Sequence, residues 1–286
     1  APVPALVNPL VADDPRGPPP LPFRASVTRP RAGRAPKGNH AMATSTDEQL
    51  RELTKGQTVP TEFLKTVTEY GSSRALRWME GEDWKELTFS QLADQAARVA
   101  AGLAAQGVEH GDRVVLMLRN IYQFHVADLA VLLCGATPVS IYNSSSPDQI
   151  AYLAGHCEAK LAILEDGGFL SRFTEVADQL PDLATIVVVN PPVEGEADIV
   201  EWSSLLDHDP VDLAEAVQVA QPHDLATIIY TSGTTGNPKG VMLDHANLCW
   251  TLASRSKPTC SPVSGSFPIC RWPTLPSGRP AITASS

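Results

Sequence analysis

The sequence predicts an α/β fold, with a largely parallel sheet flanked by helices. Short apolar runs at residues 112–118, 161–165 and 184–190 have the length of buried strands. Segments with helical periodicity separate these runs, and such alternation is typical of a sheet covered on both faces. A chain of 286 residues is also long enough to bury a sizeable core.

The first expected elements are a hairpin and a long helix. Residues 75–89 predict two strands around a turn at Gly81, with Trp78 and Trp84 available to pack across it. Thr88, followed three residues later by Gln91, predicts a capping box that opens a helix. One face of that helix carries apolar residues, and a glycine follows near its end: Leu92, Ala96, Val99, Leu103 and Gly107.

The remaining elements follow the same alternation. We expect helices at 126–133 and 147–155, and strands at 137–142 and 224–230 in addition to the runs named above. The strand at 224–230 leads directly into a segment rich in glycine and hydroxyl side chains. That segment is therefore expected at the end of a strand.

Composition excludes several classes of protein. The net charge of -10 argues against nucleic-acid binding, which needs a basic face. The longest apolar run, 126–142, contains Asp128 and Pro138 and is shorter than the roughly 20 residues that span a bilayer, so we expect no transmembrane helix. Five cysteines without a C-x-x-C pair suggest neither disulfides nor a zinc site, and we expect a cytoplasmic protein.

The two ends differ from the body. Ten of the 25 prolines lie in residues 1–41, which we interpret as a disordered leader rich in proline and arginine, with Met42 as the natural start. Residues 251–286 contain no Asp or Glu, six prolines and twelve Ser or Thr, and are expected to be a disordered tail. The body at 42–250 is the predicted domain.

The segment Tyr-Thr-Ser-Gly-Thr-Thr-Gly-Asn-Pro-Lys-Gly at 230–240 predicts a phosphate-binding loop. Glycines let backbone N–H groups turn toward an anion, hydroxyl groups add donors, and a lysine adds a mobile charge. A Walker A loop would need Gly before the lysine and Ser or Thr after it, whereas Pro238 and Gly240 stand there. A plain surface turn would explain the glycines but not the ordered run of hydroxyl groups.

This segment resembles the signature T-S-G-T-T-G-x-P-K-G of the adenylate-forming enzymes, which include acyl-CoA synthetases, luciferases and adenylation domains of peptide synthetases. The resemblance covers residues 75–250 and implies the N-terminal portion of the adenylate-forming fold, a partial AMP-binding domain. Residues 135–153 look like long-chain fatty acyl-CoA synthetases. Tyr142, Gln149 and Tyr152 within that stretch are equally compatible with ordinary packing and capping.

The resemblance implies activation of a long-chain fatty acid to acyl-AMP, then acyl-CoA, with ATP, Mg²⁺ and CoA taking part. The ATP phosphates would contact seven residues, and Thr234 would also share the magnesium ion: Thr231, Ser232, Gly233, Thr234, Thr235, Gly236 and Lys239. His245 and Asn247 match an H-x-N that follows the loop in this family, and a capping or packing role is the leading reading of His245. The greasy substrate suggests peripheral membrane contact.

The family also has an acid that binds ribose and a catalytic lysine in a later domain, and neither has a match after Gly240. The chain is therefore expected to be incomplete and inactive alone, with no catalytic residue of its own. When the codons for residues 269–278 are read in a shifted frame, they permit L-P-M-A-H-I-A-E-R, which resembles the segment that follows the loop in these synthetases. We interpret residues 251–286 as out of frame, with a C-terminal half encoded in another frame as a candidate partner. The alternatives are an acyl-AMP ligase, an amino-acid adenylation domain, or a non-catalytic fragment.

Overall fold

The computed structural model describes residues 44–192, 199–231 and 237–255. Residues 1–41 and 256–286, for which a disordered leader and tail are expected, lie outside this part of the chain. The last described helix, α9 (His245–Arg255), extends five residues past the expected domain boundary at residue 250. Thr251–Arg255 therefore continue the body as a helix.

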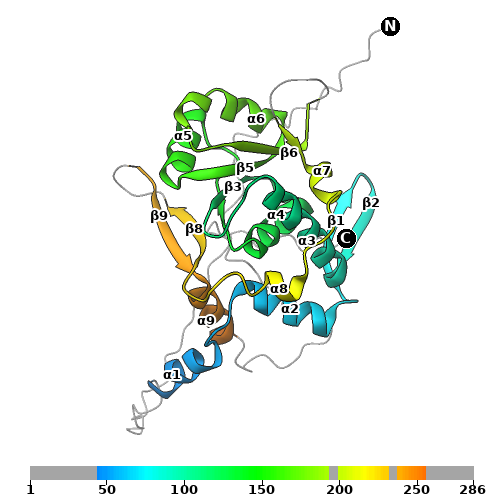
Figure 1. The fold of residues 1–286 in the computed structure, drawn as a ribbon, viewed down its shortest axis with the longest axis vertical. Helices are drawn as coiled ribbons and strands as arrows, with labels where there is room; N and C mark the ends of the chain where they lie inside the picture. Colours follow the sequence, from blue (N-terminus) through cyan, green and yellow to red (C-terminus); the bar gives the residue numbers. More distant parts are fainter. Residues whose placement is uncertain (1–43, 193–198, 232–236, 256–286) are drawn as a thin grey trace, which may run out of the picture. The chain divides into compact units, whose positions relative to one another are not determined.

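The central feature is a five-stranded, entirely parallel sheet (Figure 1). Its strand order is β4-β3-β5-β6-β7. The strands are β3 (Arg113–Met117), β4 (Thr137–Ser140), β5 (Ala159–Asp166), β6 (Thr185–Asn190) and β7 (Val200–Glu201). The α/β prediction with a largely parallel sheet is confirmed, and four of these strands lie on runs expected from sequence.

Helices cover both faces of the sheet, so alternate strand residues enter two separate cores. Val114 and Leu116 face one core, which also contains residues of α3 (Phe89–Ala105), α4 (Tyr122–Leu133) and α7 (Trp202–Leu206). Val115 and Met117 face the other, which contains residues of α5 (Pro147–His156) and α6 (Gly167–Thr174). All four strand residues are fully buried, which explains the unbroken apolar run in the sequence.

Local capping starts the helices where the sequence predicts. In α3, the Thr88 hydroxyl accepts from the Gln91 N–H at 3.3 Å, and the Gln91 side chain accepts from the Thr88 N–H at 2.9 Å. The four predicted core residues of this helix are buried, and Gly107 just beyond it has a φ of 83°, in the region that favours glycine. Ser146 and Gln149 form the same reciprocal cap for α5.

The predicted hairpin is formed by β1 (Arg74–Glu80) and β2 (Asp83–Thr88). Its two tryptophans do not pack on each other, because Trp84 pairs with Met79 and therefore lies on the opposite face from Trp78. Trp78 stacks on Tyr122 of α4, with ring centroids 4.4 Å apart. Trp84 is 49% exposed, and the Arg77 guanidinium lies 4.2 Å from its ring centroid.

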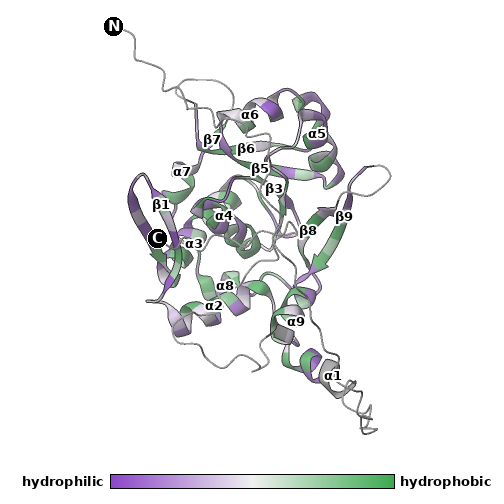
Figure 2. Cartoon of the chain, turned by 180° about the vertical axis from the view of Figure 1, so that it is seen from behind, coloured by the Kyte–Doolittle hydropathy of each residue, from purple (hydrophilic) through white to green (hydrophobic). Residues whose placement is uncertain are grey.

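Several described elements were not expected from the sequence. They are α1 (Thr44–Leu53), α2 (Val59–Tyr70), α6, the 3₁₀ turn η2 (Ala177–Gln179), β7, α7, α8 (Leu213–Ala216), β9 (Lys239–Asp244) and α9. The expected strand at 224–230 is β8 (Leu225–Thr231), but it pairs with β9 in an antiparallel hairpin instead of joining the parallel sheet. Figure 2 shows hydrophobic residues on this hairpin and on α4.

Candidate functional site

The predicted phosphate loop lies at the tip of the β8–β9 hairpin. Thr231 at the end of β8 pairs with Lys239 at the start of β9, and the Thr231 hydroxyl donates to the Lys239 carbonyl at 3.4 Å. Both residues are exposed. The five residues between the strand ends, Ser232, Gly233, Thr234, Thr235 and Gly236, lie outside the described part of the chain. The hairpin therefore places the first and the last predicted phosphate contacts opposite each other.

Lys239 is available for a ligand. Its side chain is exposed, and it takes part in none of the ion pairs between described residues. An ammonium group that is not paired with a carboxylate can bind an anion without first breaking an ion pair. Phosphate binding by Thr231 and Lys239 stays a prediction, and the exposure of both residues is compatible with it.

Close packing explains why the last residue of the signature, Gly240, is a glycine. Gly240 pairs with Tyr230 across the hairpin, and a Cβ atom at position 240 would lie 2.8 Å from Ile228 Cγ2 and 3.4 Å from Tyr230 Cε1. The buried Tyr230 side chain occupies the space that a larger residue would need. Glycine at 240 therefore lets β9 follow β8 closely.

Helix α5 contacts both arms of the loop, which we define as Tyr230–Thr231 before it and Pro238–Lys239 after it. The Tyr152 hydroxyl donates to the Pro238 carbonyl at 2.9 Å. The Tyr230 hydroxyl lies 2.8 Å from His156 Nδ1 and donates to the Leu153 carbonyl at 3.4 Å. Burial raises the pKa of Tyr230, so its hydroxyl remains a hydrogen-bond donor at neutral pH.

Sequence reasoning missed Tyr230 and His156 as supports of the loop. The available signal was the i, i+4 spacing of Tyr152 and His156, which places both side chains on one face of α5. Their rings lie 5.4 Å apart. The sequence is compatible with either a family feature or ordinary packing at Tyr152, and the structure gives this residue a specific partner on the loop.

The hairpin is attached to the parallel sheet through side chains. Strand β8 contacts β4, but it belongs to a separate two-stranded sheet. The Thr137 hydroxyl donates to the Leu225 carbonyl at 2.8 Å, and the Thr227 hydroxyl donates to the Pro138 carbonyl at 3.1 Å. Pro138 has no N–H to contribute to a backbone ladder. Two threonines therefore locate the hairpin beside the sheet.

The H-x-N segment after the loop has structural contacts. His245 is buried, and its Nδ1 accepts from the Val59 N–H at 3.2 Å, at the start of α2. Burial lowers the pKa of His245, which favours the neutral ring that can accept at Nδ1. Asp244 caps α9, because its Oδ1 accepts from the Asn247 N–H at 2.6 Å, and the Asn247 Oδ1 accepts from the Asp244 N–H at 3.4 Å. These contacts favour the capping and packing reading of the segment.

The other two residues singled out in the stretch that resembles long-chain fatty acyl-CoA synthetases are Tyr142 and Gln149, and neither serves the described part of the loop directly. Tyr142 is 55% exposed, and the Gln149 side chain serves the cap of α5. Neither contacts the loop through a hydrogen bond between described residues. Of the three open residues, Tyr152 alone meets the described part of the loop through such a bond.

A charged cluster lies at the carboxyl ends of β3 and β5, where the strand order changes direction. The Arg119 guanidinium lies 2.8 Å from Glu165 Oε1 and 2.6 Å from Asp166 Oδ2, and the Glu165 carboxylate also accepts from the Arg119 N–H. Asp166 in turn caps α6. The Arg119 guanidinium is therefore already paired with two carboxylates within the fold.

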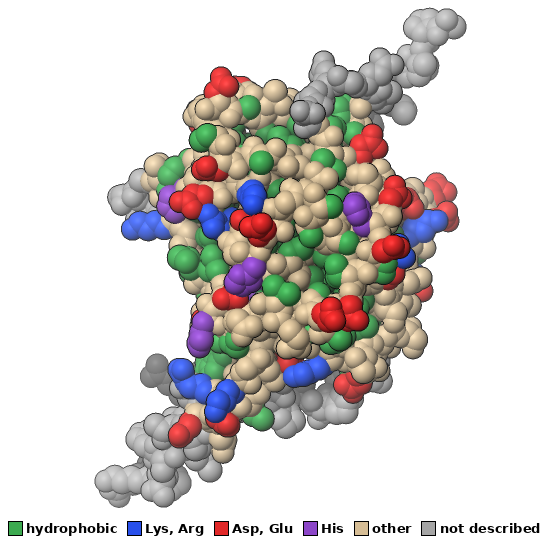
Figure 3. All heavy atoms as spheres, in the orientation of Figure 1, with side chains coloured by type: hydrophobic (Ala, Val, Ile, Leu, Met, Phe, Trp, Pro, Cys, Tyr) green, Lys and Arg blue, Asp and Glu red, His purple; other side chains and the backbone are tan. Residues whose placement is uncertain are grey.

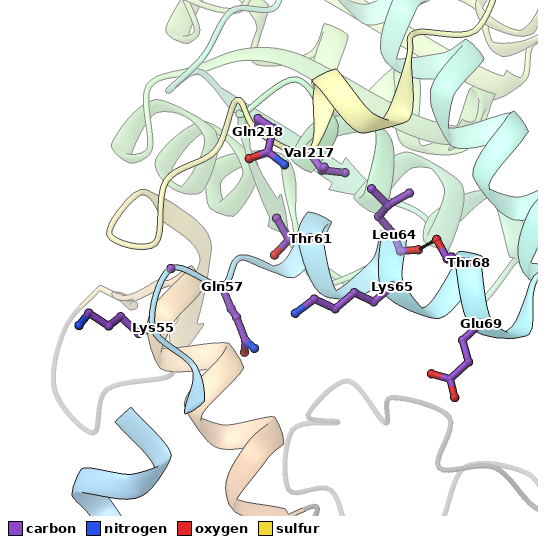
Figure 4. Close-up of a pocket in the computed structure, with 10 residues that line it drawn as sticks. Lys55, Gln57, Thr61, Leu64, Lys65, Thr68, Glu69, Val217 and Gln218 are labelled. Carbon is purple, nitrogen blue, oxygen red and sulfur yellow. Dashed lines mark hydrogen bonds between the residues drawn. The ribbon is translucent and has the colours of Figure 1, made fainter. Parts of the chain in front are cut away.

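A shallow groove of about 700 Å³ lies away from the loop, between α2, the turn before it and residues 217–218 (Figure 4). Each of its two lysines has an acidic neighbour three residues earlier in the chain: Lys65 lies 2.6 Å from Glu62, and Lys55 lies 3.5 Å from Glu52. The face drawn in Figure 3 also carries acidic and basic side chains interspersed with one another. The groove contains none of the predicted site residues.

The described residues contain no group of three or more His, Cys, Asp or Glu side chains placed to hold a metal ion. Among the helices of this part of the chain, none has both the length and the apolar character needed to cross a bilayer.

Comparison with known proteins places this geometry in a family. The chain is 32% identical over 200 residues to the long-chain-fatty-acid--CoA ligase ACSBG2 of Xenopus laevis, covering 68% of this chain and 27% of that protein. It is 30% identical over 199 residues to ACSBG1 of Homo sapiens, covering 68% of this chain and 28% of the relative. The chain thus spans little more than a quarter of the length of these curated relatives.

Solved structures share the fold. The anthranilate CoA ligase AuaEII, in complex with anthranoyl-AMP, superposes with a TM-score of 0.61 at 24% identity, over 68% of this chain and 36% of that one. Acetoacetyl-CoA synthetase from Streptomyces lividans gives a TM-score of 0.60 at 24% identity, over 70% of this chain and 32% of that one. The expected N-terminal portion of the adenylate-forming fold is therefore confirmed. The family model described as AMP-binding enzyme matches residues 63–267, and the chain belongs to this family.

Proposed function

We propose that this chain forms the N-terminal part of a long-chain fatty-acid--CoA ligase, the part that binds the ATP phosphates. We call this binding the phosphate grip. The observation that supports the proposal most strongly is the complete loop signature at the tip of a hairpin in which the exposed Lys239 pairs with Thr231. The relatives at about 30% identity are long-chain-fatty-acid--CoA ligases by name, which supports the substrate class.

In the proposed reaction, a fatty-acid carboxylate attacks the α-phosphorus of ATP. An acyl-adenylate forms, and pyrophosphate leaves. The thiolate of CoA then attacks the acyl carbonyl, and AMP leaves. Donors aimed at the departing pyrophosphate stabilise the charge that develops on it, which is the usual contribution of a protein to phosphoryl-type chemistry.

The loop residues take distinct roles in this proposal. Backbone N–H groups of Gly233 and Gly236, with the hydroxyl groups of Thr231, Ser232, Thr234 and Thr235, bind the β- and γ-phosphate oxygens, and Lys239 supplies a positive charge. Mg²⁺ would be held by the phosphates together with the Thr234 hydroxyl, and it would neutralise phosphate charge when bound. Hydroxyl and phosphate oxygens suit this hard cation, so the donor set fits it.

The residues of this chain to which we assign a role are those that would bind the ATP phosphates. We place the protein in the cytoplasm, with peripheral membrane contact through its greasy substrate.

Titration of the full chain with MgATP and with magnesium pyrophosphate tests the proposal. A hydrogen bond to a charged group contributes about 1.5–3 kcal/mol, so Lys239→Met should weaken the binding of both ligands roughly tenfold or more. Lys85→Met, which removes an exposed lysine from β2, is the matched control and should bind like wild type. Wild-type chain that binds neither ligand at millimolar concentration would refute the phosphate grip.

The acid that is activated requires a second assay. Exchange of labelled pyrophosphate into ATP that depends on palmitate would support the long-chain ligase. Exchange that depends on an amino acid would instead identify an amino-acid-activating enzyme.

A further inference from the structure

We infer that Tyr152 is a positioning residue for the Pro238–Lys239 arm of the phosphate loop. This inference rests on the proposed function and adds a residue on a different helix to the loop machinery. Tyr152 lies 86 positions before Pro238 in the sequence, and its hydroxyl donates to the Pro238 carbonyl at 2.9 Å. Nothing in the loop signature itself indicates this contact.

The contact acts on Lys239 through the peptide bond. The Pro238 carbonyl and the Lys239 N–H belong to one planar unit, so fixing the carbonyl also fixes the direction of that N–H and the start of β9. Proline further restricts the backbone at 238 through its ring. One hydrogen bond at this carbonyl therefore orients the residue that carries the proposed charge.

Packing does little to hold this arm. In β9, Val241 is 45% exposed and Met242 is 67% exposed, although neighbouring strand residues point to opposite faces. Both faces of the strand are therefore open to solvent near its start, within the part of the chain that the structure describes. Lys239 is held by its pairing with Thr231 and by the Tyr152 contact on the residue before it.

The other arm depends on the same helix face. His156, one turn after Tyr152 on α5, lies 2.8 Å from the Tyr230 hydroxyl, directly before Thr231. The Tyr152 and His156 rings are 5.4 Å apart, so the two contacts form neighbouring supports for the two arms. The arm that begins with Thr231 also has a buried tyrosine to hold it, whereas Pro238 is only partly buried. Loss of Tyr152 should consequently affect the lysine arm more.

The test compares Tyr152→Phe with Tyr122→Phe in the full chain. Tyr122 is a half-buried tyrosine of α4 that stacks on Trp78, and phenylalanine keeps that stacking. Dissociation constants for magnesium pyrophosphate and MgATP are measured well below the thermal midpoint of each variant. We expect Tyr152→Phe to raise the dissociation constants of both ligands about fivefold, and by the same factor for each, because one hydrogen bond is lost. Tyr122→Phe should remain within twofold of wild type.

The outcomes separate the inference from the function on which it rests. Wild-type chain that binds both ligands, with Tyr152→Phe within twofold of it, overturns the positioning role and leaves the phosphate grip intact. An equal loss in both variants also overturns it, because general destabilisation would then explain the effect. Wild-type chain that binds neither ligand removes the proposed function, and the inference with it.

Discussion

A buried carboxyl group in α4 should make the protein less stable as pH rises. Asp128 is 7% exposed, and its carboxyl group takes part in none of the side-chain hydrogen bonds or ion pairs between described residues. Burial raises the pKa of Asp128 from 3.8 to about 7. The folded state therefore keeps this carboxyl protonated at pH values at which the unfolded chain has already released the proton.

The sign and size of the effect follow from that difference in pKa. Below about pH 4 both states are protonated, and Asp128 has no pH-dependent cost. Between pH 4 and pH 7 only the unfolded state ionises, so the free energy of unfolding falls; above pH 7 the loss is complete. Each pKa unit is worth about 1.36 kcal/mol, so the full loss is on the order of 4 kcal/mol.

Asp128→Asn removes the titration while keeping a similar shape. Urea unfolding at pH 4 and at pH 8, on either side of the pI near 5.1, gives the free energy of unfolding of each variant. The stability of Asp128→Asn relative to wild type should rise by about 4 kcal/mol from pH 4 to pH 8. Asp83→Asn, which changes an exposed carboxylate in β2, should show no such rise. A relative stability of Asp128→Asn that is equal at both pH values would refute this reasoning.

Three smaller tests probe other features by thermal unfolding or chemical labelling. Trp78→Ala should cost about 1–3 kcal/mol because it removes the stacking on Tyr122, and clearly more than Trp84→Ala at its exposed position; equal losses would contradict the observed faces of the hairpin. Gly240→Ala should destabilise the chain by about 1–3 kcal/mol through overpacking, and an unchanged midpoint would show that the hairpin has room there. Burial raises the pKa of Cys157 to about 11, so its alkylation at pH 8, mapped by mass spectrometry, should be far slower in native than in urea-unfolded chain; equal rates would mean that the thiol is accessible.

Four of the five parallel strands and the helices α3, α4 and α5 were predictable because their signals are local. A strand buried on both faces has a short apolar run, and a capping box fixes the first turn of a helix within four residues. Thr88 with Gln91 is the clearest example, because both halves of the predicted cap are present. Such features depend on neighbours in the sequence and not on the rest of the fold.

The hairpin and the loop supports depend on distant partners. Strand β9 is partly or fully exposed along its length, so it lacks the alternation that marks a half-buried strand. The two tryptophans were expected together because they flank a turn, but the register places them on opposite faces. The contact between Tyr152 and Pro238 joins residues far apart in the chain, and no spacing rule predicts it. The loop itself could be recognised because its glycine and hydroxyl pattern lies within eleven residues.

The contact between β8 and β4 determines how the β8–β9 hairpin separates from the parallel sheet during local unfolding. The contact made by the hydroxyl groups of Thr137 and Thr227 has fewer hydrogen bonds to break than a backbone ladder, so we expect the hairpin to open before the parallel sheet does. Amide protons of β8 and β9 should then exchange with solvent together, through a partial opening that leaves β3 and β5 protected. If a nucleotide binds at the hairpin tip as proposed, it should change how often the β8–β9 hairpin opens. The parallel sheet would not need to open.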